Sequence, residues 1–252
     1  MSKHTDVEAG IALEGVVRVL GGRRVLDDVE LEVRPHERVG IVGRSGVGKS
    51  TLLSVIAGLS EADAGRVAVA GKEAQADRLA QSALMPQGDC LLPWRTALDN
   101  AGLALENAGL TRREARSRAA PLFERLGLAG AEALRPARLS GGMRQRVAFV
   151  RTLLADKPVL LLDEPFGALD AITRAELQEW LTGALESEPR TVLFVTHDVE
   201  EALLLCDRVL VLAAGRVASE LSVGVPRAAS RRETVTSGAF VELRERALEA
   251  IG

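Results

Sequence analysis

The sequence predicts an α/β fold: a mainly parallel β-sheet crossed by helices, with an all-helical segment inserted into it. Short apolar runs of strand length alternate with helical stretches at both ends of the chain. Those in the C-terminal half are apolar throughout, which is typical of parallel strands buried on both faces. The middle of the chain, residues 89–139, is instead rich in Ala, Arg, Glu and Leu. With 252 residues, the chain is long enough for one large domain.

The N-terminal part contains three predicted strands and a helix. The patterns of Ile11–Leu20 and Val25–Val33 are those of β-strands. Arg38–Val42 is a short apolar strand that runs into a glycine-rich turn. Lys49–Leu59, directly after that turn, has the length and composition of a helix.

The C-terminal half contains three apolar runs that we interpret as buried parallel strands. They are Val159–Leu162, Thr191–Val195 and Arg208–Leu212. Between the first two, the apolar residues of Ala171–Glu188 follow the helical period, which predicts a helix with Trp180 facing the core.

The insertion and the tail are both predicted to be helical. In the insertion, Thr111 and Glu114 match a capping box that opens a helix, and Pro121 starts or kinks the next one. We expect residues 11–221 to form the main domain. The tail, residues 222–252, loses the β pattern and ends in a helix with apolar positions at Phe240, Leu243, Ala247, Leu248 and Ile251.

Composition excludes several classes of protein. Hydrophobic residues make up 47% of the chain and charged residues 27%, so a disordered or fibrous chain does not fit. The net charge of −3 disfavours nucleic-acid binding. Cys90 and Cys206 are far apart, which argues against a disulfide framework and for a reducing cytoplasm. No apolar stretch has the length of a signal peptide core or a membrane span, so a membrane role would require a partner.

The first chemical motif is a phosphate-binding loop, Gly-x4-Gly-Lys-[Ser/Thr], between a predicted strand and helix. Its glycines let backbone N–H groups point at phosphate oxygens, and the following helix presents its positive N-terminal end to the same phosphates. Lys49 would supply a charge to the β- and γ-phosphates, and Ser50 a hydroxyl ligand to Mg²⁺. The candidate nucleotide-binding residues here are Gly43, Arg44, Ser45, Gly46, Val47, Gly48, Lys49, Ser50 and Thr51.

The second motif is a buried strand that ends in two adjacent carboxylates, Asp163 and Glu164. Such a pair suits a site that holds Mg²⁺ and activates a water beside it. Asp163 would be the Mg²⁺ partner and Glu164 the general base. The alternative, a surface strand ending in two solvated acids, is made less plausible by the phosphate-binding loop upstream.

The third motif, Leu-Ser-Gly-Gly-Met-Arg-Gln-Arg at residues 139–146, opens a predicted helix. With it the chain resembles the ATP-binding subunit of an ATP-binding-cassette (ABC) transporter, whose signature is Leu-Ser-Gly-Gly-Gln or a close variant. The resemblance implies a P-loop NTPase cassette: a mainly parallel RecA-like sheet with helices, an antiparallel β subdomain and the inserted helical subdomain. It also implies ATP and Mg²⁺, held in a head-to-tail homodimer whose Ser140, Gly141 and Gly142 grip the opposite subunit's ATP.

Three weaker motifs complete the resemblance. Gln87 matches the glutamine loop, which senses Mg²⁺ and the γ-phosphate. Asp170 matches the loop that contacts the phosphate-binding loop across the dimer. His197, after the next buried strand, matches the switch histidine that holds the γ-phosphate and the attacking water.

The segment around Trp94 indicates a branch of the family. Leu-Leu-Pro-Trp-Arg at residues 91–95 is similar to nitrate, sulfonate and taurine importers and to carriers of thiamine-precursor pyrimidines. A single cassette without a fused membrane domain also fits importers. We interpret Trp94 as lining the groove that docks the membrane subunit; the alternative is an ordinary core or lid residue.

One position departs from the family. Many relatives have an aromatic residue, often Tyr, that stacks on adenine near the end of the first strand, where this chain has Leu20. With seven aromatic residues in all and no Tyr, the chain has few stacking groups to offer. We expect Leu20, with Val25, to hold the base less firmly and to permit some use of GTP.

The resemblance therefore implies an ATP hydrolase (ABC-type translocase) at the cytoplasmic face of the membrane. Its expected partners are integral membrane permease subunits and, indirectly, a substrate-binding protein, with no nucleic acid. Two alternatives are a soluble ABC ATPase that acts on DNA or ribosomes and a non-catalytic assembly switch. The sequence does not identify the transported substrate.

Overall fold

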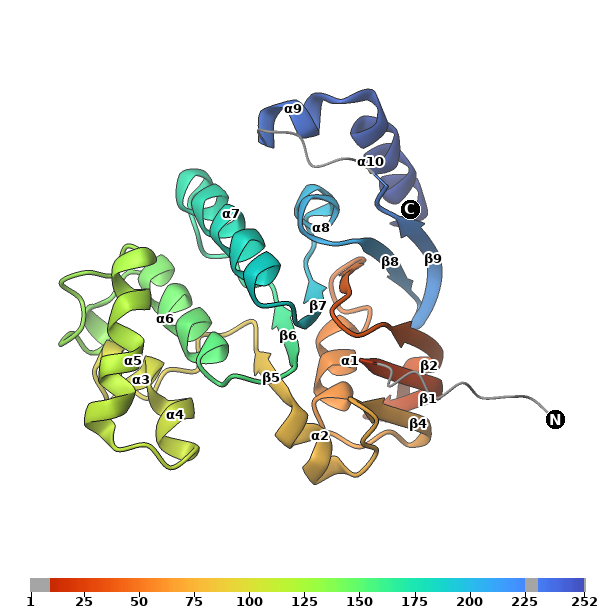
Figure 1. The fold of residues 1–252 in the computed structure, drawn as a ribbon. Helices are drawn as coiled ribbons and strands as arrows, with labels where there is room; N and C mark the ends of the chain where they lie inside the picture. The colour runs from red at the N-terminus through yellow and green to blue at the C-terminus, as the bar shows by residue number, and fades with distance from the viewer. Residues whose placement is uncertain (1–9, 225–230, 252) are drawn as a thin grey trace.

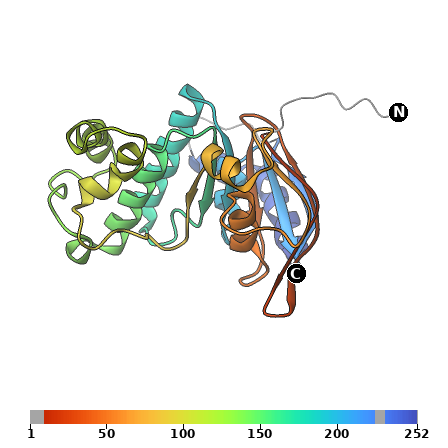
Figure 2. The same ribbon diagram turned by 90° about the horizontal axis from the view of Figure 1, so that it is seen from below.

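The computed structural model describes residues 10–224 and 231–251, which form two β-sheets with helices packed around them. The larger sheet lies in the middle of the molecule, between a lobe of helices and the smaller sheet (Figures 1 and 2). Residues 1–9 at the N-terminus, and residues 225–230 and 252 of the tail, lie outside the described residues.

The larger sheet has the strand order β5-β6-β7-β3-β8-β9. Its first five strands are parallel, and β9 runs antiparallel to β8. The carboxyl ends of β5, β6, β7 and β3 therefore lie side by side along one edge. The strands are β3 (Arg38–Val42), β5 (Ser82–Met85), β6 (Val159–Asp163), β7 (Thr191–Val195), β8 (Arg208–Ala213) and β9 (Arg216–Ser222).

The smaller sheet is antiparallel, with the order β2-β1-β4. Its strands are β1 (Ile11–Leu20), β2 (Arg23–Val33) and β4 (Ala64–Val69). Helix α1 (Lys49–Ile56) shares one hydrophobic core with both sheets, because its apolar residues pack in the same cluster as the buried residues of β1, β2, β3 and β6. This packing brings the edge of the antiparallel sheet next to the start of α1.

The helical lobe follows β5 in the chain. It contains α3 (Ala97–Ala101), α4 (Leu103–Asn107), α5 (Arg112–Arg125), the short 3₁₀ helix η1 (Pro136–Arg138) and α6 (Gly141–Leu153). The predicted capping box at Thr111 and Glu114 is present. Pro121 does not start a second helix but lies inside α5. Proline has no backbone N–H to donate, so α5 loses one hydrogen bond at this position. The free energy gained by burying Ala115, Ala119 and Phe123 on one face of α5 offsets that loss.

The remaining helices are α2 (Gln75–Gln81), α7 (Ala171–Ser187), α8 (Val199–Leu205), α9 (Arg231–Thr236) and α10 (Gly238–Ile251). Helix α10 is the predicted tail helix, with Phe240 and Ala247 buried and Leu248 exposed. It packs beside α8, where Arg244 pairs with Glu200 at 3.0 Å (Figure 1). In the described part of the chain, no helix has both the length and the apolar character needed to cross a bilayer.

Most predicted element boundaries agree with the structure, and the largest difference is at α1. This helix ends at Ile56 instead of Leu59, because Gly58 adopts a left-handed backbone with φ of 76°. A Cβ at Gly58 would lie 2.7 Å from the Gln75 carbonyl oxygen. The chain thus turns away from the helix axis toward α2.

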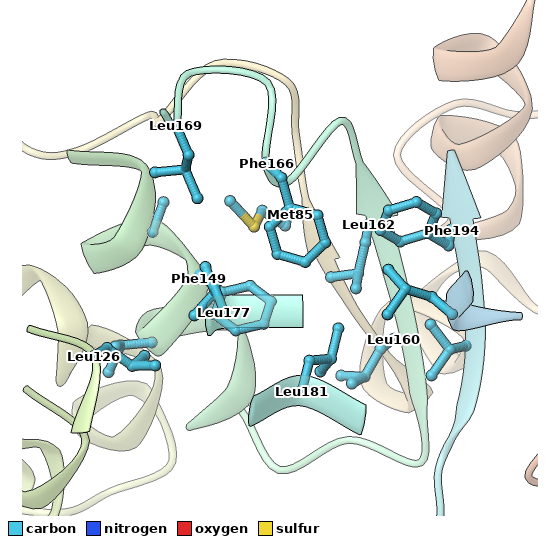
Figure 3. Close-up of a cluster of buried hydrophobic side chains, with 14 of the residues drawn as sticks. Met85, Leu126, Phe149, Leu160, Leu162, Phe166, Leu169, Leu177, Leu181 and Phe194 are labelled. Carbon is cyan, nitrogen blue, oxygen red and sulfur yellow. The ribbon is translucent and has the colours of Figure 1, made fainter. Parts of the chain in front are cut away.

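An aromatic cluster joins the larger sheet to α6 and α7 (Figure 3). Phe166 lies between Phe194 of β7 and Phe149 of α6, with ring centroids 5.7 Å and 6.1 Å apart. Trp180 of α7 meets Phe149 edge to face at 6.1 Å, so it packs against the core as predicted. Four of the seven aromatic residues therefore lie in this cluster. They pack the end of the larger sheet, from which the candidate site is built, against α6, the helix that begins within the signature motif.

Phe149→Ala tests this cluster. Phe149 is fully buried, so truncation should lower the free energy of unfolding by about 3–5 kcal/mol, measured by urea denaturation. Leu248→Ala, at an exposed position of α10, is the control and should change stability by no more than about 0.5 kcal/mol. A Phe149→Ala effect as small as the control would show that the cluster is not a main source of stability.

Candidate functional site

The phosphate-binding loop connects the end of β3 to α1, and its glycines are required by close backbone contacts. A Cβ at Gly43 would lie 2.3 Å from the carbonyl oxygen of Leu212 in β8. Gly48, the N-cap of α1, has φ of 111°, and a Cβ there would lie 2.9 Å from the Val25 carbonyl oxygen. The loop can therefore lie against the backbone of both sheets only with glycine at these two positions.

Lys49 is buried at the start of α1, and its ammonium is held by the loop itself. Its Nζ donates hydrogen bonds to the carbonyl oxygens of Gly43, at 2.7 Å, and Arg44, at 3.0 Å. Burial lowers the pKa of Lys49, although the charges of Glu164 and Asp163 oppose this shift. The loop thus holds a desolvated ammonium, and an anionic ligand bound beside it would stabilise its charged form.

A cleft of about 270 Å³ opens over the loop. Helix α1 and its loop form the floor, and Leu20 and Val25 of the antiparallel sheet form an apolar wall. Leu20 is 44% exposed, so its side chain is available to a ligand. The lining residues are Leu20, Val25, Ser45, Gly46, Gly48, Lys49, Ser50, Thr51, Gln87 and Glu164. Gly43, Arg44 and Val47 belong to the same loop but do not line the cleft.

Asp163 and Glu164 follow one another at the end of β6 but lie in different environments. Asp163 is buried and accepts a hydrogen bond from the Ser50 hydroxyl; burial raises the pKa of its carboxyl. Glu164 has a left-handed backbone with φ of 48°, and its N–H donates to the Val195 carbonyl oxygen at 2.8 Å. This conformation, unusual for a residue other than glycine, lets the Glu164 side chain line the cleft.

Glu164 is the point where three predicted residues meet. Its Oε2 accepts a hydrogen bond from Gln87 Nε2 at 3.2 Å, and its Oε1 lies 3.2 Å from His197 Nδ1. Gln87 follows β5 and His197 follows β7, so the residues come from three neighbouring strands. The His197 side chain is 64% exposed, against 19% for Glu164. The carboxylate is thus held from two sides, and the imidazole remains accessible.

The other predicted contacts do not reach this cleft within one chain. Ser140 is the N-cap of α6 and accepts a hydrogen bond from the Met143 N–H at 3.2 Å; Gly141 and Gly142 form the first turn. Asp170 is the N-cap of α7, and the hydrogen bonds that it accepts, chiefly from Thr173, lower its pKa. Among the described residues that line the cleft, Ser140, Gly141, Gly142 and Asp170 are not found.

The structure adds residues to which the sequence assigns no role. Gln145 is buried in α6, and its Nε2 donates to the Glu164 carbonyl oxygen at 3.3 Å. It lies within the signature motif, but its direction is visible only in the fold. Arg144 pairs with Asp89 at 2.8 Å and donates to the Leu139 carbonyl oxygen, which ties the signature motif to the segment after Gln87.

The residues around the cleft fit a hydrated divalent cation. Ser50 supplies a hydroxyl oxygen, Asp163 a carboxylate and Gln87 an amide oxygen, and these are the hard donors that Mg²⁺ prefers. A cation beside Asp163 would also offset the burial that disfavours its charged form.

Comparison with known proteins identifies the family. The sequence matches the ABC transporter family over residues 26–167. The chain belongs to this family. The cassette is 46% identical over 241 residues to an aliphatic sulfonates import ATP-binding protein of Rhodococcus jostii, covering 96% of this chain and 94% of that protein. It is 42% identical over 212 residues to a formylaminopyrimidine import ATP-binding protein of Halalkalibacterium halodurans, covering 84% and 82%.

Solved structures agree with this assignment. The dimeric structure of MJ0796, a bacterial ABC transporter cassette, has a TM-score of 0.79 and 30% identity, covering 84% of this chain and 98% of that chain. A dimeric post-hydrolysis state of the same cassette bound to ADP and Pi gives the same values. The predicted fold class, a P-loop cassette with a parallel sheet, an antiparallel sheet and a helical lobe, is confirmed, and the cassette binds ATP.

Proposed function

We propose that this cassette is the ATP-binding and ATP-hydrolysing subunit of an ABC importer. The observation that carries the proposal is Glu164, which is held by Gln87 and His197 beside Lys49 and Ser50 of the phosphate-binding loop. The names of the relatives support an importer, and the ADP-bound and Pi-bound structural relative supports hydrolysis.

The phosphates of ATP would lie over the loop, where the N–H groups at the start of α1 face the cleft. Lys49 would exchange its hydrogen bonds to the two loop carbonyls for phosphate oxygens, as its buried position favours. Ser50, Asp163 and Gln87 would hold Mg²⁺, which neutralises charge on the phosphates during transfer. The adenine would rest on Leu20 and Val25.

Hydrolysis requires a water activated beside the γ-phosphate. Glu164 is the general base in this proposal, because its carboxylate lines the cleft next to Lys49. His197 would orient the phosphate and the water, since its exposed imidazole lies against the same carboxylate. Gln145, behind Glu164, supports the turn that aims the base.

The active unit is proposed to be a head-to-tail homodimer that encloses two ATP molecules. Ser140, Gly141, Gly142 and Asp170 lie outside their own chain's cleft, and each group is positioned at the start of a helix, where N–H groups favour anions. The second copy would supply these groups to the phosphate. The dimeric cassettes among the structural relatives support this arrangement.

The cassette would act at the cytoplasmic face of the membrane, as a peripheral subunit bound to integral permease subunits and served indirectly by a substrate-binding protein. Aliphatic sulfonates are the favoured substrate class, because four relatives with 42–46% identity carry that name. A thiamine-precursor pyrimidine is the alternative. An ATPase that acts on DNA or ribosomes fits less well, because the net charge of −3 offers no basic excess.

The domain boundaries proposed for these roles are residues 11–221 for the cassette, with the helical subdomain at about residues 89–139, and residues 222–252 for the tail. Within the insertion, Trp94 lies on the loop before α3 and is 68% exposed. Asn100 clamps this loop, accepting from the Leu92 N–H at 2.7 Å and donating to the Thr96 carbonyl oxygen at 3.0 Å. A rigid loop that presents an indole to solvent suits a docking contact with a permease subunit.

Glu164→Gln tests the catalytic assignment. The variant should bind ATP and form a persistent ATP-dependent dimer, with phosphate release slower by about 10²–10⁴-fold because the general base is lost. Lys49→Ala should instead weaken ATP binding by about tenfold or more, since a hydrogen bond to a charged group contributes about 1.5–3 kcal/mol. Turnover at the wild-type rate in Glu164→Gln would refute the role of the base.

Leu20→Tyr tests the base contact. The wild type should discriminate between ATP and GTP by less than about a hundredfold in kcat/KM, and the variant should lower KM for ATP, because aromatic stacking contributes about 1–3 kcal/mol. Val19→Tyr is the matched control, since Val19 is exposed but does not line the cleft. An unchanged KM in Leu20→Tyr would argue against an adenine at this wall.

Trp94→Ala tests the docking surface. Truncation of a central interface aromatic costs about 2 kcal/mol or more, so the affinity for the purified permease subunits should fall by roughly thirtyfold or more. ATP hydrolysis by the cassette alone should be unchanged. Leu248→Ala removes another exposed apolar side chain, on α10, and should assemble normally. Normal assembly of Trp94→Ala would remove the docking role.

A further inference from the structure

A chain of hydrogen-bonded polar side chains runs from exposed Arg231 of α9, through buried side chains, to the strand end that carries His197. Arg231 of α9 donates a hydrogen bond to Gln178 Oε1 on α7. Gln178 Nε2 donates to Glu201 Oε1 on α8 at 3.1 Å. The Thr196 hydroxyl, at the end of β7, donates to Glu201 Oε2 at 2.8 Å. Gln178, Glu201 and Thr196 are all at least nine-tenths buried.

Thr196 fixes the turn that carries His197. Its N–H donates to the Ile41 carbonyl oxygen of β3 at 3.2 Å, and its Oγ1 accepts from the Asp198 N–H at 3.0 Å. His197 lies between these two anchored residues. A shift of the Thr196 hydroxyl would therefore change where the imidazole lies relative to Glu164.

Glu201 is the centre of this chain. A buried carboxylate is costly unless donors surround it, and here Thr196 and Gln178 donate to separate oxygens. Arg174 Nε lies 3.6 Å from Glu201 Oε1 and supplies a neighbouring positive charge. Hydrogen bonds are stronger in a site that excludes water, and losing one there costs more, so the bonds to Glu201 oppose displacement of Thr196 and Gln178.

We propose that Glu201 and Gln178 are positioning residues for ATP hydrolysis, and that Arg231 connects the C-terminal helices to them. The chain of hydrogen bonds holds Thr196, and through it the position of His197 against Glu164. This inference rests on the proposed function, since it assigns a role to residues behind the proposed switch histidine. It also makes the hydrolysis rate depend on how α9 is seated.

The direction of the hydrogen bonds makes the chain testable. The three side-chain hydrogen bonds all point toward the Glu201 carboxylate, which accepts at both oxygens. In Glu201→Gln, the new amide can keep only one of the two hydrogen bonds that Glu201 accepts. If its oxygen faces Gln178, the bond that the Thr196 hydroxyl donates is lost. If its oxygen faces Thr196, its NH₂ faces the NH₂ of Gln178; rotating the Gln178 amide to accept from that NH₂ would turn the NH₂ of Gln178 toward the guanidinium of Arg231.

Arg231→Glu removes that second conflict by placing an acceptor at the end of the chain. In the double variant Glu201→Gln/Arg231→Glu, residue 201 would donate to Gln178, and Gln178 would donate to the new carboxylate. The bond from Thr196 is kept. Each single variant breaks the chain, whereas the double variant restores it with part of its direction reversed.

The experiment measures steady-state ATP hydrolysis by the full-length wild type, the two single variants and the double variant. We expect each single variant to lower kcat by about ten- to a hundredfold, the effect of a small misplacement near the chemistry, with KM for ATP unchanged. The double variant should recover most of the loss. Arg244→Gln, which removes the α10–α8 ion pair outside the chain, is the control and should keep the wild-type kcat.

A spectroscopic readout separates positioning from general loosening. The chain has three histidines, so the imidazole resonances of His197 can be assigned by comparison with a His197→Gln variant. They should shift in the single variants and return toward wild-type values in the double variant. Single variants that keep the wild-type kcat, or a double variant no better than the worse single variant, would overturn the positioning role alone. A wild type without ATPase activity would overturn the proposed function as well.

Discussion

The arrangement of the site depends on one constraint, the in-register parallel pairing of four neighbouring strands. Met85 of β5 pairs with Leu162 of β6, Asp163 with Val195 of β7, and Val195 with Ile41 of β3. The glutamine loop, the carboxylates, the histidine turn and the phosphate-binding loop therefore leave the sheet at the same edge. Backbone hydrogen bonds set this alignment. Gln87 and His197, which are distant from Glu164 in the sequence, therefore lie about 3 Å from its carboxylate.

Burial at this edge sets the electrostatics. Strands covered on both faces leave little water around Lys49 and Asp163. Burial therefore disfavours the charged form of both side chains, lowering the pKa of Lys49 and raising that of Asp163. Hydrogen bonds partly compensate: Lys49 donates to the Gly43 carbonyl oxygen, and Asp163 accepts from the Ser50 hydroxyl. The aromatic cluster around Phe166 then fixes the segment after Glu164 against α6. The same packing that stabilises the fold therefore keeps the site poised for an anion and a cation bound together.

The sequence predicted the fold class and the candidate residues because both depend on local signals. Apolar runs locate buried strands, and glycine spacing reveals a turn with close backbone contacts, as at Gly43 and Gly48. What it could not predict depends on direction and long-range packing. Gln145 and Glu201 look like ordinary polar helix residues until the fold turns them toward Glu164 and Thr196. The assignment of Pro121 to a new helix was wrong because tertiary burial along α5 outweighed its local preference. The chemical roles of the site residues stay predictions.

The central claim is that these residues form an ATPase that works as a pair of copies. The most direct measurement is phosphate release from ATP by the purified wild-type chain in Mg²⁺, followed as a function of protein concentration. A dimeric active unit predicts a rate that rises more steeply than in proportion to protein concentration until the dimer is saturated. ATP binding without phosphate release would contradict the catalytic account, and a strictly proportional rate from a chain that stays monomeric with ATP would contradict the shared site.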